Sequence, residues 1–117
     1  MTQEDKQLLL KDLCARLPYD VIMTNKMLTK TYYPLDGNEW QQAYYDDDWD
    51  DVPYLRPMSS MTEEEKLMYE GLMIGADNVS YMLDVIDWLN VHHFDYRGLI
   101  EKGLAIAVTE KNNPYKD

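Results

Sequence analysis

The strongest constraint on the fold is a change of hydrophobic spacing at Pro18. Before this proline, Leu9, Leu13 and Leu17 recur every four residues, which predicts the apolar face of a helix. After it, residues 20–33 are rich in β-branched and aromatic side chains, which favour strands. A chain that changes from one period to the other is expected to pack a helix against a sheet, so the predicted class is α+β.

The predicted sheet is small and antiparallel and is built largely from residues 20–58. Asn25-Lys26 is a candidate two-residue hairpin turn within it. Residues 39–45 have spacings that suit a helix, but their aromatic content and their place after strands favour a strand. Residues 52–58 contain two prolines and are expected to run extended across the surface.

The second half of the chain is predicted to hold two or three helices over residues 60–103. Ser60 or Thr62 precedes a run of acids, which is typical of a helix N-terminus. Asp95 is placed to cap a short further helix, and residues 104–108 are expected to form a last strand. The side chains expected to be largely buried are Leu9, Leu13, Leu17, Met68, Leu72, Met82, Ile86, Leu89, Leu99 and Leu104.

The 117 residues suit one domain, expected over residues 1–108 with a tail at 109–117. Cys14 is the single cysteine and lies beside the leucine stripe, which predicts a buried, inert thiol and a reducing compartment. No apolar run approaches the roughly 18 residues of a membrane span, and the N-terminus lacks the pattern of a signal peptide. A cytoplasmic protein is therefore expected.

Charge is the main compositional signal, because 22 acids stand against 11 bases for a net charge of -11. Such a chain repels nucleic-acid phosphates and anionic lipid surfaces, so direct binding to nucleic acid or membrane is not expected. The excess of acids serves solubility, or it selects a protein partner with a basic surface.

The segment from Thr31 to Leu55 concentrates acids and aromatic side chains and contains no base. Tyrosine and tryptophan are enriched at interface hot spots, and surrounding acids would select a basic partner. The alternative is that the aromatics form a packed face of the sheet while the acids face water. The candidate partner-binding residues are Trp40, Tyr45, Asp46, Asp47, Asp48, Trp49, Asp50 and Asp51.

A calcium site in this acidic run is disfavoured. Asp46, Asp48 and Asp50 match the first three ligand positions of an EF-hand loop, but Asp51 stands where the loop needs glycine. Pro57 stands where the loop needs a bidentate glutamate.

The weaker alternative is a metal-dependent hydrolase centred on His92, His93 and Asp95, whose side chains are of types that bind zinc or iron. No phosphate-binding glycine loop, dinucleotide fingerprint or nucleophile elbow is present. The sequence therefore predicts neither a cofactor nor an enzyme activity.

Three stretches, residues 7–19, 53–65 and 87–105, resemble a family of small uncharacterised proteins found in gut anaerobes and in their prophages and phages. Residues 20–52 depart from the pattern of that family. The resemblance implies shared architecture and an origin in a mobile element, and it assigns no activity and no catalytic residue. Together with the charge, it leads to the expectation of a small acidic accessory protein that acts by protein–protein contact.

Overall fold

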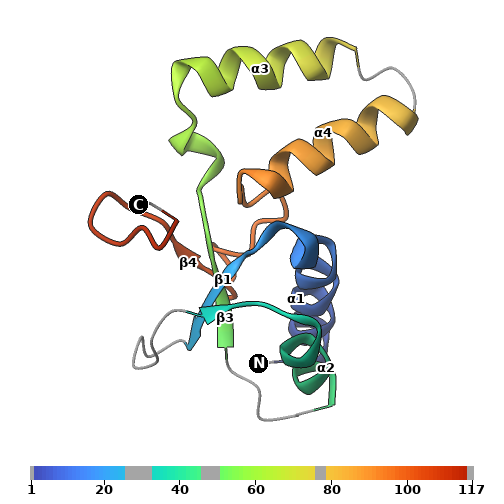
Figure 1. The fold of residues 1–117 in the computed structure, drawn as a ribbon, viewed down its shortest axis with the longest axis vertical. Helices are drawn as coiled ribbons and strands as arrows, with labels where there is room; N and C mark the ends of the chain where they lie inside the picture. The colour runs from blue at the N-terminus through green and yellow to red at the C-terminus, as the bar shows by residue number, and fades with distance from the viewer. Residues whose placement is uncertain (1, 26–32, 46–50, 76–78, 116–117) are drawn as a thin grey trace.

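The computed structural model describes residues 2–25, 33–45, 51–75 and 79–115 (Figure 1). Helix α1 (Gln3–Arg16) begins after Thr2, whose hydroxyl oxygen accepts a hydrogen bond from the Asp5 backbone N–H at 3.0 Å. The helix continues into the short 3-10 helix η1 (Leu17–Tyr19), which contains Pro18 and ends at Asp20 in the left-handed conformation. The predicted first helix is confirmed.

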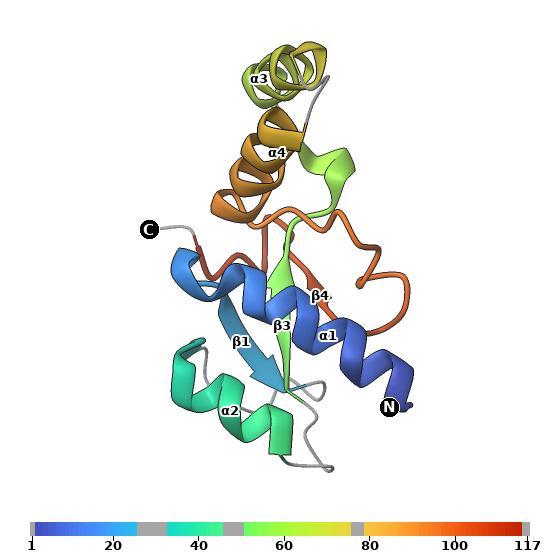
Figure 2. The same ribbon diagram turned by 90° about the vertical axis from the view of Figure 1, so that its right-hand side faces the viewer.

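Four short strands follow the order β2-β1-β3-β4 in one sheet: β1 (Ile22–Asn25), β2 (Tyr33–Pro34), β3 (Asp51–Leu55) and β4 (Ile106–Ala107). β1 pairs antiparallel with both β2 and β3, whereas β3 and β4 are parallel. The α+β class is confirmed, and the sheet is mixed instead of wholly antiparallel. Helix α1 crosses one face of it (Figure 2).

The register of the strands corrects two expectations. A two-residue turn at Asn25-Lys26 would pair Met23 with Leu28. In the structure Met23 lies opposite Tyr33 instead. Lys26 itself lies outside the described residues. β3 does not run across the surface, because all five of its residues are buried between β1 and β4. Val52 to Leu55 form an apolar run, as expected for a strand that is covered on both faces. Pro53 lies within the sheet.

Residues 39–45 belong to a helix, α2 (Gly37–Tyr45), so the predicted strand is wrong. The four-residue spacing brings the Trp40 and Tyr44 rings into a stack with centroids 5.7 Å apart. The Trp40 indole N–H also donates to the Leu10 carbonyl of α1 at 3.2 Å. This packing of α2 on α1 outweighs the strand propensity of the aromatic side chains.

A short 3-10 helix, η2 (Met58–Ser60), leads into α3 (Glu63–Ile74), which is followed by α4 (Val79–Val91). Thr62 caps α3 and forms a capping box with Glu65, as one of the two expected arrangements requires. The predicted short helix after Asp95 is a series of turns. Gly98 holds a positive φ angle within that stretch, which α-helical geometry does not allow.

Two clusters of buried side chains make up the core. The larger one lies where α1 meets the sheet and consists of Leu9, Leu13, Val21, Met23, Leu35, Leu55, Leu99, Leu104 and Ala105. The smaller one, Val85, Leu89 and Phe94, joins α4 to the rest of the molecule. Of the side chains expected to be buried, Met68 and Met82 are exposed, while Leu17, Leu72 and Ile86 are half-buried and the other five are buried.

A buried charge cluster fixes the C-terminal part of α1. The Arg16 guanidinium, wholly buried, donates to both Asp12 carboxylate oxygens at 2.6 and 3.2 Å and to the Phe94 carbonyl at 2.7 Å. Arg97 Nε also lies 3.1 Å from the Asp12 carboxylate. The Asp12–Arg16 pair of α1 thus binds the segment that follows α4.

Tyr115, which falls in the predicted tail, packs against the larger core cluster. Its hydroxyl accepts a hydrogen bond from the Ile22 N–H at 2.9 Å and donates to the Tyr54 carbonyl at 2.7 Å. Burial raises the pKa of this phenol well above its usual value. Within the described residues, no helix is long and apolar enough to cross a membrane.

Candidate functional site

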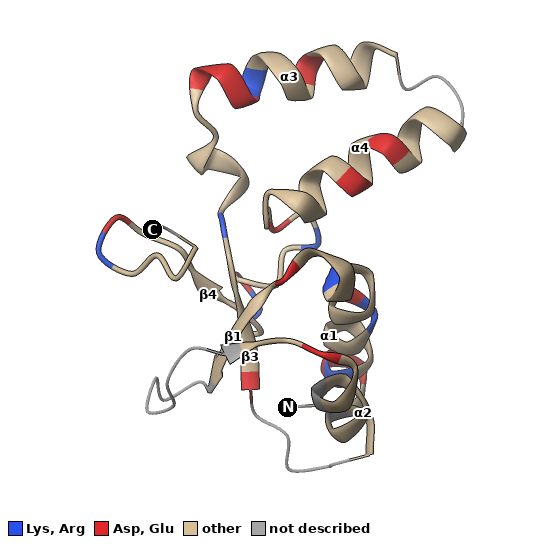
Figure 3. Ribbon diagram, in the orientation of Figure 1, with Lys and Arg blue, Asp and Glu red and all other residues tan. Residues whose placement is uncertain are grey.

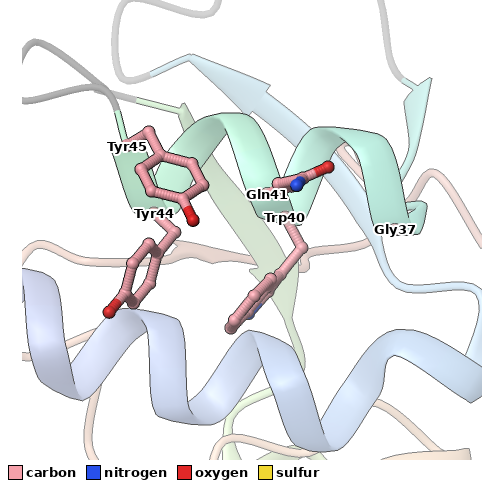
Figure 4. A pocket seen from close by; sticks show the side chains of 5 residues that line it. All are labelled: Gly37, Trp40, Gln41, Tyr44 and Tyr45. Carbon is pink, nitrogen blue, oxygen red and sulfur yellow. The ribbon is translucent and has the colours of Figure 1, made fainter.

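Helix α2 presents the aromatic residues that the sequence singled out. Trp40 is half-buried against α1, whereas Tyr44 and Tyr45 are 55% and 74% exposed. An open hollow of about 550 Å³ is lined by these three residues together with Gly37 and Gln41 (Figure 4). Trp40 therefore has a packing role, and Tyr44 and Tyr45 are the accessible part of this face.

The predicted acidic surface cannot be assembled from described residues. Asp46, Asp47, Asp48, Trp49 and Asp50 lie outside them. Asp51 is only 2% exposed, because it begins the central strand β3 and pairs with Asn25 of β1. Asp51 is thus a residue of the sheet and not of a partner-binding surface.

A second hollow, of about 520 Å³, lies between α1 and α2. Cys14 lines it and is exposed, so the expectation of a buried thiol is wrong. The four-residue leucine stripe of α1 faces the sheet, and Cys14 lies one position beyond Leu13 and so turns away from that face. The lining residues are Gln7, Leu10, Lys11, Cys14, Ala15, Trp40, Tyr44 and Arg97.

The structure gives His92, His93 and Asp95 separate surroundings. His93 stacks on Tyr115 with ring centroids 3.8 Å apart, and burial, reinforced by the charge of Arg16, lowers its pKa to about 4. Both Asp95 oxygens accept backbone hydrogen bonds from the turn that follows, at 2.9 and 3.0 Å. His92 packs on Trp88 instead. No group of three potential metal ligands occurs among the described residues.

The joint between α3 and the sheet is an ion pair that sequence reasoning missed. Arg56, directly after β3, donates two hydrogen bonds to the Glu65 carboxylate at 2.7 and 2.6 Å. Its guanidinium also lies 4.2 Å from the centre of the Phe94 ring. This pairing lowers the pKa of Glu65 to about 2. Glu65 therefore fixes the start of α3 and is not free to contact a partner.

Beyond this joint, α3 stands at one end of the long axis of the molecule, away from α1 and α2, and α4 lies between α3 and α1 (Figures 1 and 2). We call α3 and α4, residues 63–74 and 79–91, the arm. The two helices pack together through the side chains of Tyr69, Leu72, Val85 and Trp88. Nine large apolar side chains of the arm stay exposed: Leu67, Met68, Met73, Ile74, Val79, Tyr81, Met82, Leu83 and Val91.

The sequence placed the apolar face of α4 toward the core, and the structure buries only part of it. Met82, expected to be buried, is exposed, and Val79 and Leu83 of the same helix are 76% and 55% exposed. The one sequence signal that could have indicated a docking surface here, and was not used, is the breadth of the apolar sector of α3, where Leu67 and Ile74 lie opposite Tyr69 on the helix. A helix that is apolar on several sides needs more cover than one neighbouring helix provides.

Neither a protein-family model nor a curated sequence nor a solved structure shows a significant match to this chain. The resemblance to small proteins of gut anaerobes and phages accordingly stays a prediction.

Proposed function

We propose that this chain is a small acidic accessory protein that acts by protein–protein contact and docks on its partner through the arm. The observation that carries the proposal is the exposure of nine large apolar side chains on two neighbouring helices. Exposed apolar side chains that are concentrated on one part of a monomeric protein mark an interaction surface more often than scattered ones do.

The position of the arm supports the same proposal. The arm projects from the sheet and is anchored at its base by Arg56, Glu65 and Phe94, so its outer faces are open to a large partner. Apolar side chains without cover favour association, because burying them removes apolar surface from water. The methionines Met68, Met73 and Met82 add flexible side chains that adapt to the shape of a partner.

The experiment is affinity capture from the native host with three forms of the protein: wild type, an arm variant and a matched control. The arm variant is L67S together with L83S, and the control is Y44S together with Y45S on α2; all four side chains are more than half exposed. Exposed positions are chosen so that both variants keep the fold, which circular dichroism and thermal unfolding verify.

The proposal predicts a partner retained by the wild type and the control and lost by the arm variant. A partner retained by the arm variant and lost by the α2 control would place docking on α2 and contradict the proposal. A partner retained equally by all three forms would contradict it as well.

A further inference from the structure

The exposed side chains of the arm alternate with acids along defined rows. On α3, Glu63, Leu67, Glu70 and Ile74 are spaced by four, three and four residues, which places them along one side of the helix. Leu67 and Ile74 are 69% and 86% exposed. A partner that covers these two side chains therefore lies beside two carboxylates.

The exposed row of α4 has the same character. Val79, Leu83 and Asp87 follow one another at intervals of four residues, and Asp84 lies next to Leu83 in the chain. Val79 and Leu83 are exposed, as are both aspartates. Apolar contact to α4 is thus also accompanied by negative charge.

The charged side chains of the arm are almost all negative. Helices α3 and α4 carry the acids Glu63, Glu64, Glu65, Glu70, Asp84 and Asp87 against one base, Lys66 (Figure 3). Lys66 lies 3.7 Å from Glu63 and offsets part of its charge. Glu65 is occupied by Arg56, which leaves the other acids around the apolar rows.

This charge decides among the candidate occupants. A second copy of the chain would bring the acids of one arm against those of the other, with a net charge of -11 on each molecule. An anionic membrane surface would repel the same acids. A helix with an apolar stripe bordered by lysine or arginine complements both the apolar rows and the carboxylates.

We infer that the arm binds a basic amphipathic helix of a partner protein. The apolar stripe of that helix covers Leu67 and Ile74 on α3, and its flanking cations lie near Glu63 and Glu70. This inference rests on the proposed function, because it takes the arm as the docking surface and names the chemistry of what the arm binds.

The probe is an 18-residue peptide of leucine and lysine with its leucines on one helical face, labelled with a fluorophore and titrated by anisotropy. A peptide of the same composition in scrambled order lacks the apolar stripe, and a leucine–glutamate peptide keeps the stripe and reverses the charge. Together they separate amphipathic recognition from general attraction between opposite charges.

The inference predicts that the leucine–lysine peptide binds and that its affinity falls as salt is raised. L67S with I74S should weaken it at least tenfold, and E63Q with E70Q should weaken it less and flatten its salt dependence. Y44S with Y45S should leave binding unchanged. Equal binding of the scrambled peptide, tight binding of the leucine–glutamate peptide, or no effect of the arm substitutions would overturn it.

Sedimentation of the wild type and the arm variant separates this inference from the proposed function. A wild-type dimer that L67S with L83S makes monomeric would identify a second copy as the occupant, overturning the inference and keeping the arm as the docking surface. Flotation of the wild type, but not of the arm variant, with phosphatidylcholine vesicles would overturn both, because the occupant would be lipid and not protein.

Discussion

Glu65 is predicted to be a main anchor of the arm, and E65Q is the perturbation that tests it. Its carboxylate receives two hydrogen bonds from Arg56 and one from the Thr62 backbone N–H at 2.9 Å. Only 16% of the Glu65 side chain and 22% of the Arg56 side chain are exposed. An ion pair with this geometry and burial contributes more than an isolated surface pair.

The magnitude follows from the pKa of Glu65, which falls from 4.5 to about 2. At about 1.4 kcal/mol for each tenfold change in the acid constant, this corresponds to about 3 kcal/mol. Solvent at the edge of the pair screens part of the interaction, so E65Q should lower the free energy of unfolding by about 2 kcal/mol at pH 7.

The dependence on pH has a defined sign. The folded-state pKa of Glu65 is depressed, so the stabilisation is fully present above pH 4.5 and is lost as pH falls toward 2. Urea unfolding of the wild type and E65Q at a series of pH values measures the difference between them. That difference should be present at neutral pH and shrink below pH 4.5.

The matched control is E64Q, because Glu64 is the exposed neighbour of Glu65 in the same helix turn. E64Q should change the free energy of unfolding by less than about 0.5 kcal/mol. If E65Q destabilised the protein no more than E64Q, or by the same amount at pH 3 as at pH 7, the ion pair would not be the anchor described above.

Three further predictions concern the body of the protein. D12A leaves the buried Arg16 guanidinium without its carboxylate and should cost about 3–5 kcal/mol in urea unfolding; a loss below 1 kcal/mol would mean that water reaches Arg16. Y115F removes a hydroxyl that bridges two strands and should cost about 1–3 kcal/mol, with a change near zero contradicting the bridge. The exposed Cys14 should react with a thiol reagent in the folded protein as rapidly as in urea, and protection by folding would show that it is buried.

The sequence was most informative where local chemistry decides the structure. The Thr62 cap was one of the two predicted, because one side-chain oxygen satisfies a nearby backbone N–H. The leucine stripe of α1 was predicted because one face of a helix must be covered. These features depend on residues within one or two turns of each other.

The incorrect predictions concern residues whose secondary structure or position is set by contacts with residues distant in the sequence. Residues 39–45 became helical because Trp40 reaches the Leu10 carbonyl, thirty residues earlier in the chain. Pro53 suggested a surface strand, and the pairing of β3 with both β1 and β4 places it at the centre of the sheet. Neither contact leaves a signal in the local pattern.

The arm shows the same limit for the candidate site. Met68, Met82 and the apolar face of α4 were assigned to the core from their spacing. Spacing shows that a face of a helix is apolar, but it does not show what covers that face. The ion pair of Arg56 and Glu65 joins residues nine apart across an irregular segment, where no fixed spacing applies.

The most direct test of the docking surface is the methionine methyl spectrum of the protein during titration with the leucine–lysine peptide. Met68, Met73 and Met82 report on the arm, and Met23, wholly buried in the sheet, is the internal reference. Each resonance is assigned by single substitution with leucine. We predict that the Met68 and Met73 resonances of α3 shift together and saturate while that of Met23 stays in place. If the arm resonances stayed in place at saturating peptide, the arm would not be the surface by which this chain binds a basic helix.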